Sequence, residues 1–121
     1  MNIYTSYYAN CKNLDESKYM LISISRTHPK GFKIAKIPAF APSKDLLSLY
    51  KTGTMSDDDY TKIYSDEISY IDIREQLKAL CPLAHGRDLV MLCWEAPDKF
   101  CHRHILANLI WQQYGYRVHE L

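Results

Sequence analysis

Residues 88–113 constrain the fold of this chain more than any other stretch. The stretch opens with an uninterrupted apolar run, residues 89–92, which has the length and composition of a buried β-strand. From Cys101 onward, apolar residues recur every three or four positions, as on one face of a helix. Pro97 and Asp98 lie between the two segments and predict a turn, with Asp98 as the N-cap of the helix. The stretch therefore predicts a strand, a short loop and a helix.

The polar residues of this stretch gather where the strand gives way to the helix, and they are Cys93, Glu95, Cys101, His102, Arg103 and His104. The first turn of a helix carries unpaired backbone N–H groups and a partial positive charge, so it favours a bound anion. We therefore expect the functional site at this strand-to-helix corner, from Cys93 to Arg103.

Other segments supply further strands and helices. Apolar or alternating patterns predict strands that begin at Ile3, Met20 and Tyr116, and residues 33–37 are either a minor strand or a connection. Residues suited to N-caps stand before three apolar stripes, and they are Ser43, Ser56 and Asp72. Strands separated by helices favour a mostly parallel sheet, in which ligands bind beyond the carboxyl ends of the strands. The expected fold is a single α/β domain over residues 1–121, with a sheet of about four strands flanked by helices.

Composition narrows the class of protein. The formal net charge of +1 provides no overall field toward nucleic acid or an anionic membrane, so neither is expected as a partner. The N-terminus lacks the pattern of a secretory signal, and no apolar run reaches membrane-spanning length. A cytoplasmic location is expected, in which the four cysteines are free thiols. A disulfide between Cys93 and Cys101 stays open, because the strand end and the helix start can lie close together. A homo-oligomer also stays open as a possible assembly.

The corner also carries a family resemblance. The segments Leu92-Cys93-Trp94-Glu95 and Phe100-Cys101-His102-Arg103 together resemble the signature of the domain of unknown function 488 family. Residues 3–7, 50–53 and 59–60 resemble one compact subgroup of it, so the likeness spans nearly the whole chain. The resemblance implies a small Rossmann-like α/β domain of prokaryotic or phage type and implies no established reaction. Many relatives have a second arginine after Cys-His-Arg, where this chain has His104.

Arg103 is the residue expected to hold a ligand. A guanidinium beside free N–H groups suits a bidentate contact to a phosphate or a carboxylate, and a structural pair with Glu95 or another acid has equal weight. On the first interpretation, Arg103→Ala weakens binding more than Lys51→Ala does and leaves the fold intact. The other ligand-binding candidates have packing or a solvated loop as the alternative, and they are Thr5, Ser6, Tyr7, Tyr60, Tyr64 and Cys93.

Three side chains are candidates for catalysis. Glu95, just past a strand end, could act as a base or as a nucleophile toward a sugar carbon. His102 is either a general acid or base, with a pKa lowered by the helix start, or a buried structural histidine. Cys101 lies near the helix start, where a thiolate is favoured. A phosphatase-like cradle is not favoured, because Cys93 is ten residues from Arg103 and Cys101 is too close to it to form the compact loop.

A metal is the less favoured hypothesis. Cys101 and His104 are three residues apart on one expected helical face, and Cys93 could supply a third ligand, which is the number in catalytic zinc sites. Arg103 places a permanent positive charge beside that set, so no metal or other cofactor is predicted.

The favoured functional hypothesis is a site at the corner for a phosphate-bearing, nucleotide-related small molecule, which the protein hydrolyses or transfers. Two alternatives stay open. One is a module that captures a signalling nucleotide without changing it, and the other is a thiol or metal site through Cys93, Cys101 and His104.

Overall fold

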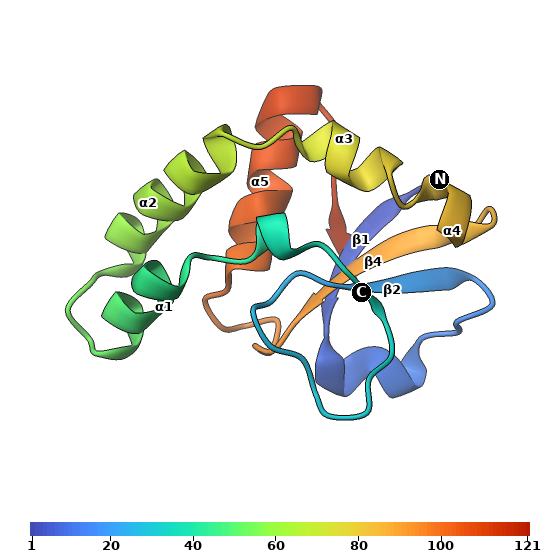
Figure 1. The fold of residues 1–121 in the computed structure, drawn as a ribbon, viewed down its shortest axis with the longest axis horizontal. Helices are drawn as coiled ribbons and strands as arrows, with labels where there is room; N and C mark the ends of the chain where they lie inside the picture. Colours follow the sequence, from blue (N-terminus) through green and yellow to red (C-terminus); the bar gives the residue numbers. More distant parts are fainter.

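The computed structural model describes residues 1–121 and contains a sheet of five strands, all parallel (Figure 1). The strands are β1 (Ile3–Tyr7), β2 (Tyr19–Ser23), β3 (Ala35–Lys36), β4 (Asp88–Cys93) and β5 (His119–Glu120). Their order across the sheet is β3-β2-β4-β1-β5, so β4 is the middle strand. The predicted α/β class and parallel pairing are confirmed, and the sheet is consistent with a small Rossmann-like fold. It has one strand more than expected, because the minor segment at residues 33–37 does pair with β2.

Five α-helices and two 3₁₀ helices connect the strands. They are η1 (Tyr8–Asn13), η2 (Pro38–Phe40), α1 (Lys44–Lys51), α2 (Asp57–Ser69), α3 (Ile73–Lys78), α4 (Cys81–Ala84) and α5 (His102–Tyr114). The three predicted caps are confirmed: the side chains of Ser43, Ser56 and Asp72 each accept a hydrogen bond from a backbone N–H three residues later.

The start of α5 differs from the prediction. Asp98 was the expected cap, but a turn closed by the Lys99 N–H on the Ala96 carbonyl at 3.0 Å contains it. The cap is Cys101, whose backbone is extended, with φ −154° and ψ 144°. Cys101 therefore lies outside the helix, and the helical spacing expected between Cys101 and His104 does not exist.

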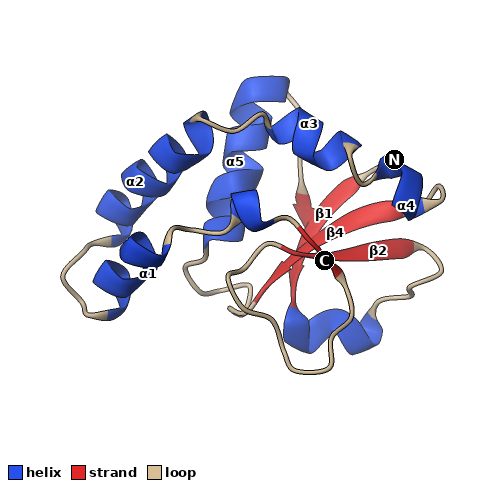
Figure 2. Ribbon diagram, viewed as in Figure 1, coloured by secondary structure: helices blue, strands red, loops and turns tan.

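The sheet separates a large core from a small one. Leu89 and Met91 of β4 face the large core, which the α-helices complete, whereas Val90 and Leu92 face the small one. In Figure 2 the α-helices gather on one side of the three long strands, and η1 lies on the other side. None of the helices is long and apolar enough to span a membrane.

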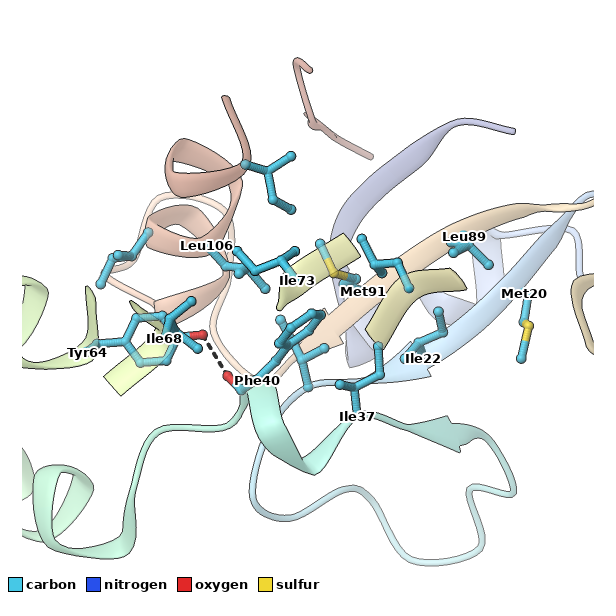
Figure 3. Packing of buried hydrophobic residues seen from close by; sticks show 14 of the residues in the cluster. Met20, Ile22, Ile37, Phe40, Tyr64, Ile68, Ile73, Leu89, Met91 and Leu106 are labelled. Atoms are coloured by element: carbon cyan, nitrogen blue, oxygen red, sulfur yellow. Dashed lines mark hydrogen bonds between the residues drawn. The ribbon is translucent and has the colours of Figure 1, made fainter. Parts of the chain in front are cut away.

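The large core also positions α1. Phe40, in η2, is fully buried, and its carbonyl accepts a hydrogen bond of 2.6 Å from the hydroxyl of Tyr64 in α2 (Figure 3). Tyr64 is fully buried as well, so the bond is shielded from water. Because η2 leads into α1 through only three residues, this contact holds α1 close to α2 and to the ends of the strands.

Candidate functional site

A pocket of about 390 Å³ opens beyond the carboxyl ends of β2 and β4. Its walls are the segments that follow these strands, the start of α5, and α1 with part of α2. The lining residues are Ser25, Arg26, Thr27, Pro42, Lys44, Leu47, Ser48, Tyr50, Lys51, Tyr60, Cys93, Trp94, Glu95, Phe100, Cys101 and His102. Open parallel sheets bind ligands at this end of the strands, and the volume is in the range of small-molecule sites.

The structure divides the predicted site residues into two groups. One group lines the pocket and consists of Tyr60, Cys93, Glu95, Cys101 and His102. The other does not contribute to the pocket and consists of Thr5, Ser6, Tyr7, Tyr64 and Arg103. The strand-to-helix corner thus provides one wall of a pocket, but its arginine points elsewhere.

Arg103 is fully buried, and its side chain is held by protein groups. Its Nε and Nη2 donate to the Glu120 carboxylate at 3.1 and 2.7 Å, and Nη1 donates to the Glu95 carbonyl at 2.7 Å and to the Cys93 sulfur at 3.1 Å. The guanidinium is therefore in the structural pair that the sequence left open. Its partner is the carboxylate of Glu120, whereas Glu95 contributes only its backbone oxygen.

The hydroxyl-rich end of β1 belongs to this same buried cluster. The Thr5 hydroxyl donates to Glu120 at 2.6 Å, the Ser6 hydroxyl donates to the Leu121 carbonyl at 3.3 Å, and the Arg103 guanidinium lies 5.8 Å from the centre of the Tyr7 ring. The parallel pairing of β1 with β5, which places Thr5 opposite Glu120, brings these groups together. Their role in the structure is to connect β1, β5 and α5.

The carboxylate of Glu120 predicts a specific loss of stability in acid. Burial raises its pKa, but the hydrogen bonds from Arg103 and Thr5 and the nearby positive charge outweigh burial and bring the pKa below its ordinary 4.5. The stabilisation is therefore complete above pH 4.5 and is lost as the pH falls through the lowered pKa. In urea unfolding, Glu120→Gln should be less stable than wild type at neutral pH, and the difference should narrow in acid. A difference independent of pH would contradict the ion pair.

His102 presents one ring nitrogen to the cysteines. Its Nε2 lies 2.8 Å from the Ile24 carbonyl, and because a carbonyl only accepts, Nε2 carries the proton. The unprotonated Nδ1 then faces the Cys101 sulfur at 3.8 Å. Burial, aided by the positive charges of Arg103 and His104, lowers the pKa of His102 to about 4, although the bond to Ile24 opposes the shift. The imidazole is neutral at physiological pH.

The sulfurs of Cys93 and Cys101 are joined as a disulfide, and their α-carbons are 7.7 Å apart. The expectation of four free thiols is therefore correct for Cys11 and Cys81 and wrong for Cys93 and Cys101. The disulfide is the one that the sequence left as a possibility. The last residue of β4 and the N-cap of α5 bring the two sulfurs together.

The structure also changes the set of residues that could ligate a metal. The donor atoms of Cys93, Cys101 and His102 lie within 4.8 Å of one another, and His104 is not among them. Because α5 begins at His102, His104 is carried away from the sulfurs toward Arg103 and Glu120, whose charges act on its pKa. The pKa of His104 is lowered, first by burial and then by Arg103.

Several pocket residues were missed by reasoning from the sequence. Arg26, Lys44 and Lys51 contribute three basic side chains, and Trp94 and Phe100 contribute aromatic surface. Arg26 could have been found, because it follows β2 as Glu95 follows β4, and the carboxyl ends of neighbouring parallel strands meet at one edge. The two lysines carried no such signal, because their position depends on how α1 packs.

Comparison with known proteins gives a family match. A family model described as the active DUF488-N3 subclade matches residues 3–114, which include the whole strand-to-helix corner. No curated protein and no solved structure matches the chain.

Proposed function

The chain belongs to the domain of unknown function 488 family, and on this premise we propose that its pocket binds a phosphate-bearing, nucleotide-related small molecule. The observation that carries the proposal is the combination of three basic side chains and several aromatic rings around one opening at the carboxyl ends of β2 and β4.

The basic side chains supply the anion-binding part. Arg26, Lys44 and Lys51 are solvent-exposed, line the pocket and form no ion pair with any acid of the chain. Glu95 is the one carboxylate on the same walls, so positive charge predominates there. A guanidinium and two ammonium groups around an opening favour a phosphate over a neutral ligand. This assignment replaces Arg103 as the anion-binding residue.

The aromatic side chains supply a surface for a base. Tyr50, Tyr60 and Phe100 pack as a cluster, with ring centres 5.0 to 5.4 Å apart. Trp94 is 49% exposed, and its indole N–H donates to the carbonyl and hydroxyl of Thr27 at 3.1 Å, which orients the ring at the rim. Rings presented at an opening offer stacking to any base, which complements the charge contacts to a phosphate.

Glu95 is the group available for chemistry on the ligand. It is exposed and lines the pocket. The pKa of Tyr50 is raised mainly by its hydrogen bond to Asp57, and the pKa of Tyr60 mainly by burial. The charge of Glu95 adds to both shifts, so its carboxylate lies near these rings. As a base, Glu95 takes a proton from an attacking water while the leaving group departs with its bonding electrons. The second candidate function is capture of the nucleotide without turnover, in which Glu95 only discriminates among ligands.

Calorimetric titration with ADP and with adenosine tests the binding proposal. Wild type should bind ADP more tightly than adenosine, and Lys44→Ala/Lys51→Ala should bind ADP about tenfold more weakly or worse, because about 1.4 kcal/mol of charge-assisted contact corresponds to tenfold in affinity. Lys62→Ala is the matched control, since Lys62 is exposed on α2 outside the pocket. Equal affinity of wild type for ADP and adenosine would count against a phosphate site.

Product analysis separates turnover from capture. ADP is incubated with wild type and with Glu95→Gln, and the mixture is resolved by chromatography. Loss of ADP with wild type but not with Glu95→Gln supports hydrolysis or transfer by the carboxylate. Intact ADP in both, together with tight binding, supports the capture module.

A further inference from the structure

We propose that the reduced chain binds one zinc-like divalent metal ion through Cys93, Cys101 and His102, with a fourth coordination position that faces the pocket. The proposal does not depend on nucleotide binding, because it is based on three side chains that the fold already brings together.

The three donor atoms are close and shielded. The sulfurs of Cys93 and Cys101 and a ring nitrogen of His102 all lie within 4.8 Å of one another, and the three residues are 1%, 5% and 7% exposed. Two thiolates and one imidazole are donors that zinc prefers, at about 2.3 Å from sulfur and 2.0–2.1 Å from nitrogen. One ion can therefore contact all three with small side-chain movements.

His102 is oriented as a ligating histidine. The Nε2–H group donates to the Ile24 carbonyl at 2.8 Å, which leaves the lone pair of Nδ1 directed toward the sulfurs. A backbone carbonyl on the far nitrogen is the usual outer contact of a metal-bound histidine, because it fixes both the tautomer and the ring angle. A general base is oriented in the same way, so the ligand role rests on the two sulfurs that lie beside this nitrogen.

The surroundings support two thiolates. Arg103 donates from Nη1 to the Cys93 sulfur at 3.1 Å, and Cys101 caps α5, where the helix end favours negative charge. Two thiolates and Glu120 carry three negative charges, which a divalent ion and Arg103 balance. The positive charge of Arg103, which counted against a metal in the sequence, is therefore an outer contact that is already paired.

The ion requires the reduced form of the Cys93–Cys101 pair, because the thiolate is the form of cysteine that ligates a metal. A dithiol reductant donates two electrons and two protons to the disulfide, which gives two thiols and the oxidised reductant. Each thiol then releases its proton when its sulfur binds the ion.

The fourth position gives the site access to ligands. All three residues line the pocket, so water or a ligand oxygen can reach the ion from that side. Three protein ligands with one open position is the arrangement of catalytic zinc, whereas structural zinc has four protein ligands. The bound ion would polarise an oxygen held in the pocket beside Glu95.

Metal titration of the full chain under reducing conditions tests the proposal. Zinc binding is measured by elemental analysis after removal of free metal, and cobalt binding by the thiolate-to-cobalt absorption band. Wild type should bind about one equivalent of either ion. Cys93→Ser and Cys101→Ser should each lose the cobalt band or lower affinity at least about tenfold, because loss of an outer contact alone already costs that much.

Matched controls make the assignment specific. Cys11 and Cys81 are outside the cluster, so Cys11→Ser and Cys81→Ser should retain full binding. His102→Ala should weaken binding and His104→Ala should not, and circular dichroism identifies any variant that fails to fold. Less than about a tenth of an equivalent of bound metal on folded, reduced wild type would overturn the proposal, because a correctly formed metal site binds its ion under these conditions. Loss of metal in His104→Ala but not in His102→Ala would also overturn it. ADP affinity, measured separately without metal, reports on the proposed function alone.

Discussion

Arg103→Ala is expected to lower the free energy of unfolding by about 3 kcal/mol, the low end of the cost of breaking a buried ion pair, because the side chain of Glu120 is 24% exposed. Arg103 is fully buried, and its loss leaves the Glu120 carboxylate without two of its donors and the Glu95 carbonyl without one. The guanidinium connects α5 to β4 and β5, so these three elements lose a shared contact. Urea unfolding followed by circular dichroism measures the change.

Arg117→Ala is the matched control for this prediction. Arg117 is exposed, and its guanidinium lies 5.1 Å from the centre of the Trp111 ring, a contact worth about 0.5–1 kcal/mol at such sites. If Arg103→Ala were no more destabilising than Arg117→Ala, the ion pair with Glu120 would make no measurable contribution to the free energy of unfolding. The expectation from the sequence was the reverse, that Arg103→Ala would leave the fold intact.

The difference between the expected and the observed role of Arg103 shows which contacts can be predicted from a single sequence. The position of Arg103 at a helix start was predictable, because the periodic apolar residues of α5 are local. The partner was not predictable, because Glu120 lies opposite Thr5 only once β5 pairs with β1, and that pairing joins residues more than a hundred positions apart. Local pattern therefore predicted the helix but not the charge that neutralises its arginine.

The pocket shows the same division. Cys93, Glu95, Cys101 and His102 were predictable as neighbours, because they flank one short loop between β4 and α5. Lys44 and Lys51 belong to a different crossover, and only the docking of α1 brings them to that loop. The sequence therefore located the corner without the cations that face it.

The expected pairing of Cys101 with His104 on one helical face fails for a local reason. The spacing from Cys101 to His104 was treated as helical, but the extended backbone of Cys101 rotates its side chain out of the helical pattern. A residue at the N-cap does not share the face of the residue three positions later, and this selects His102 as the neighbour of the sulfurs.

Phe40→Ala is expected to cost about 3–5 kcal/mol of unfolding free energy and to loosen α1. Phe40 is fully buried within the large core, and it joins η2 to the residues around Tyr64 and Ile73 (Figure 3). The cavity left by the ring removes packing from the segment that leads into α1, because only three residues separate η2 from that helix. The pocket wall that carries the two lysines therefore depends on this side chain.

Urea unfolding measures the loss for Phe40→Ala, and limited digestion with trypsin under native conditions measures the local effect, since Lys44 and Lys51 are cleavage sites in α1. In the variant, the rate of cleavage at these two lysines should increase more than the rate at other sites, because local opening of α1 then costs less free energy than global unfolding. Tyr70→Ala is the matched control, since Tyr70 is 85% exposed and its removal creates no cavity. An unchanged pattern of trypsin cleavage, alongside a large loss of global stability, would show that α1 is held by its contacts with α2 and by the retained hydrogen bond from Tyr64 to the Phe40 carbonyl, and not by the Phe40 ring.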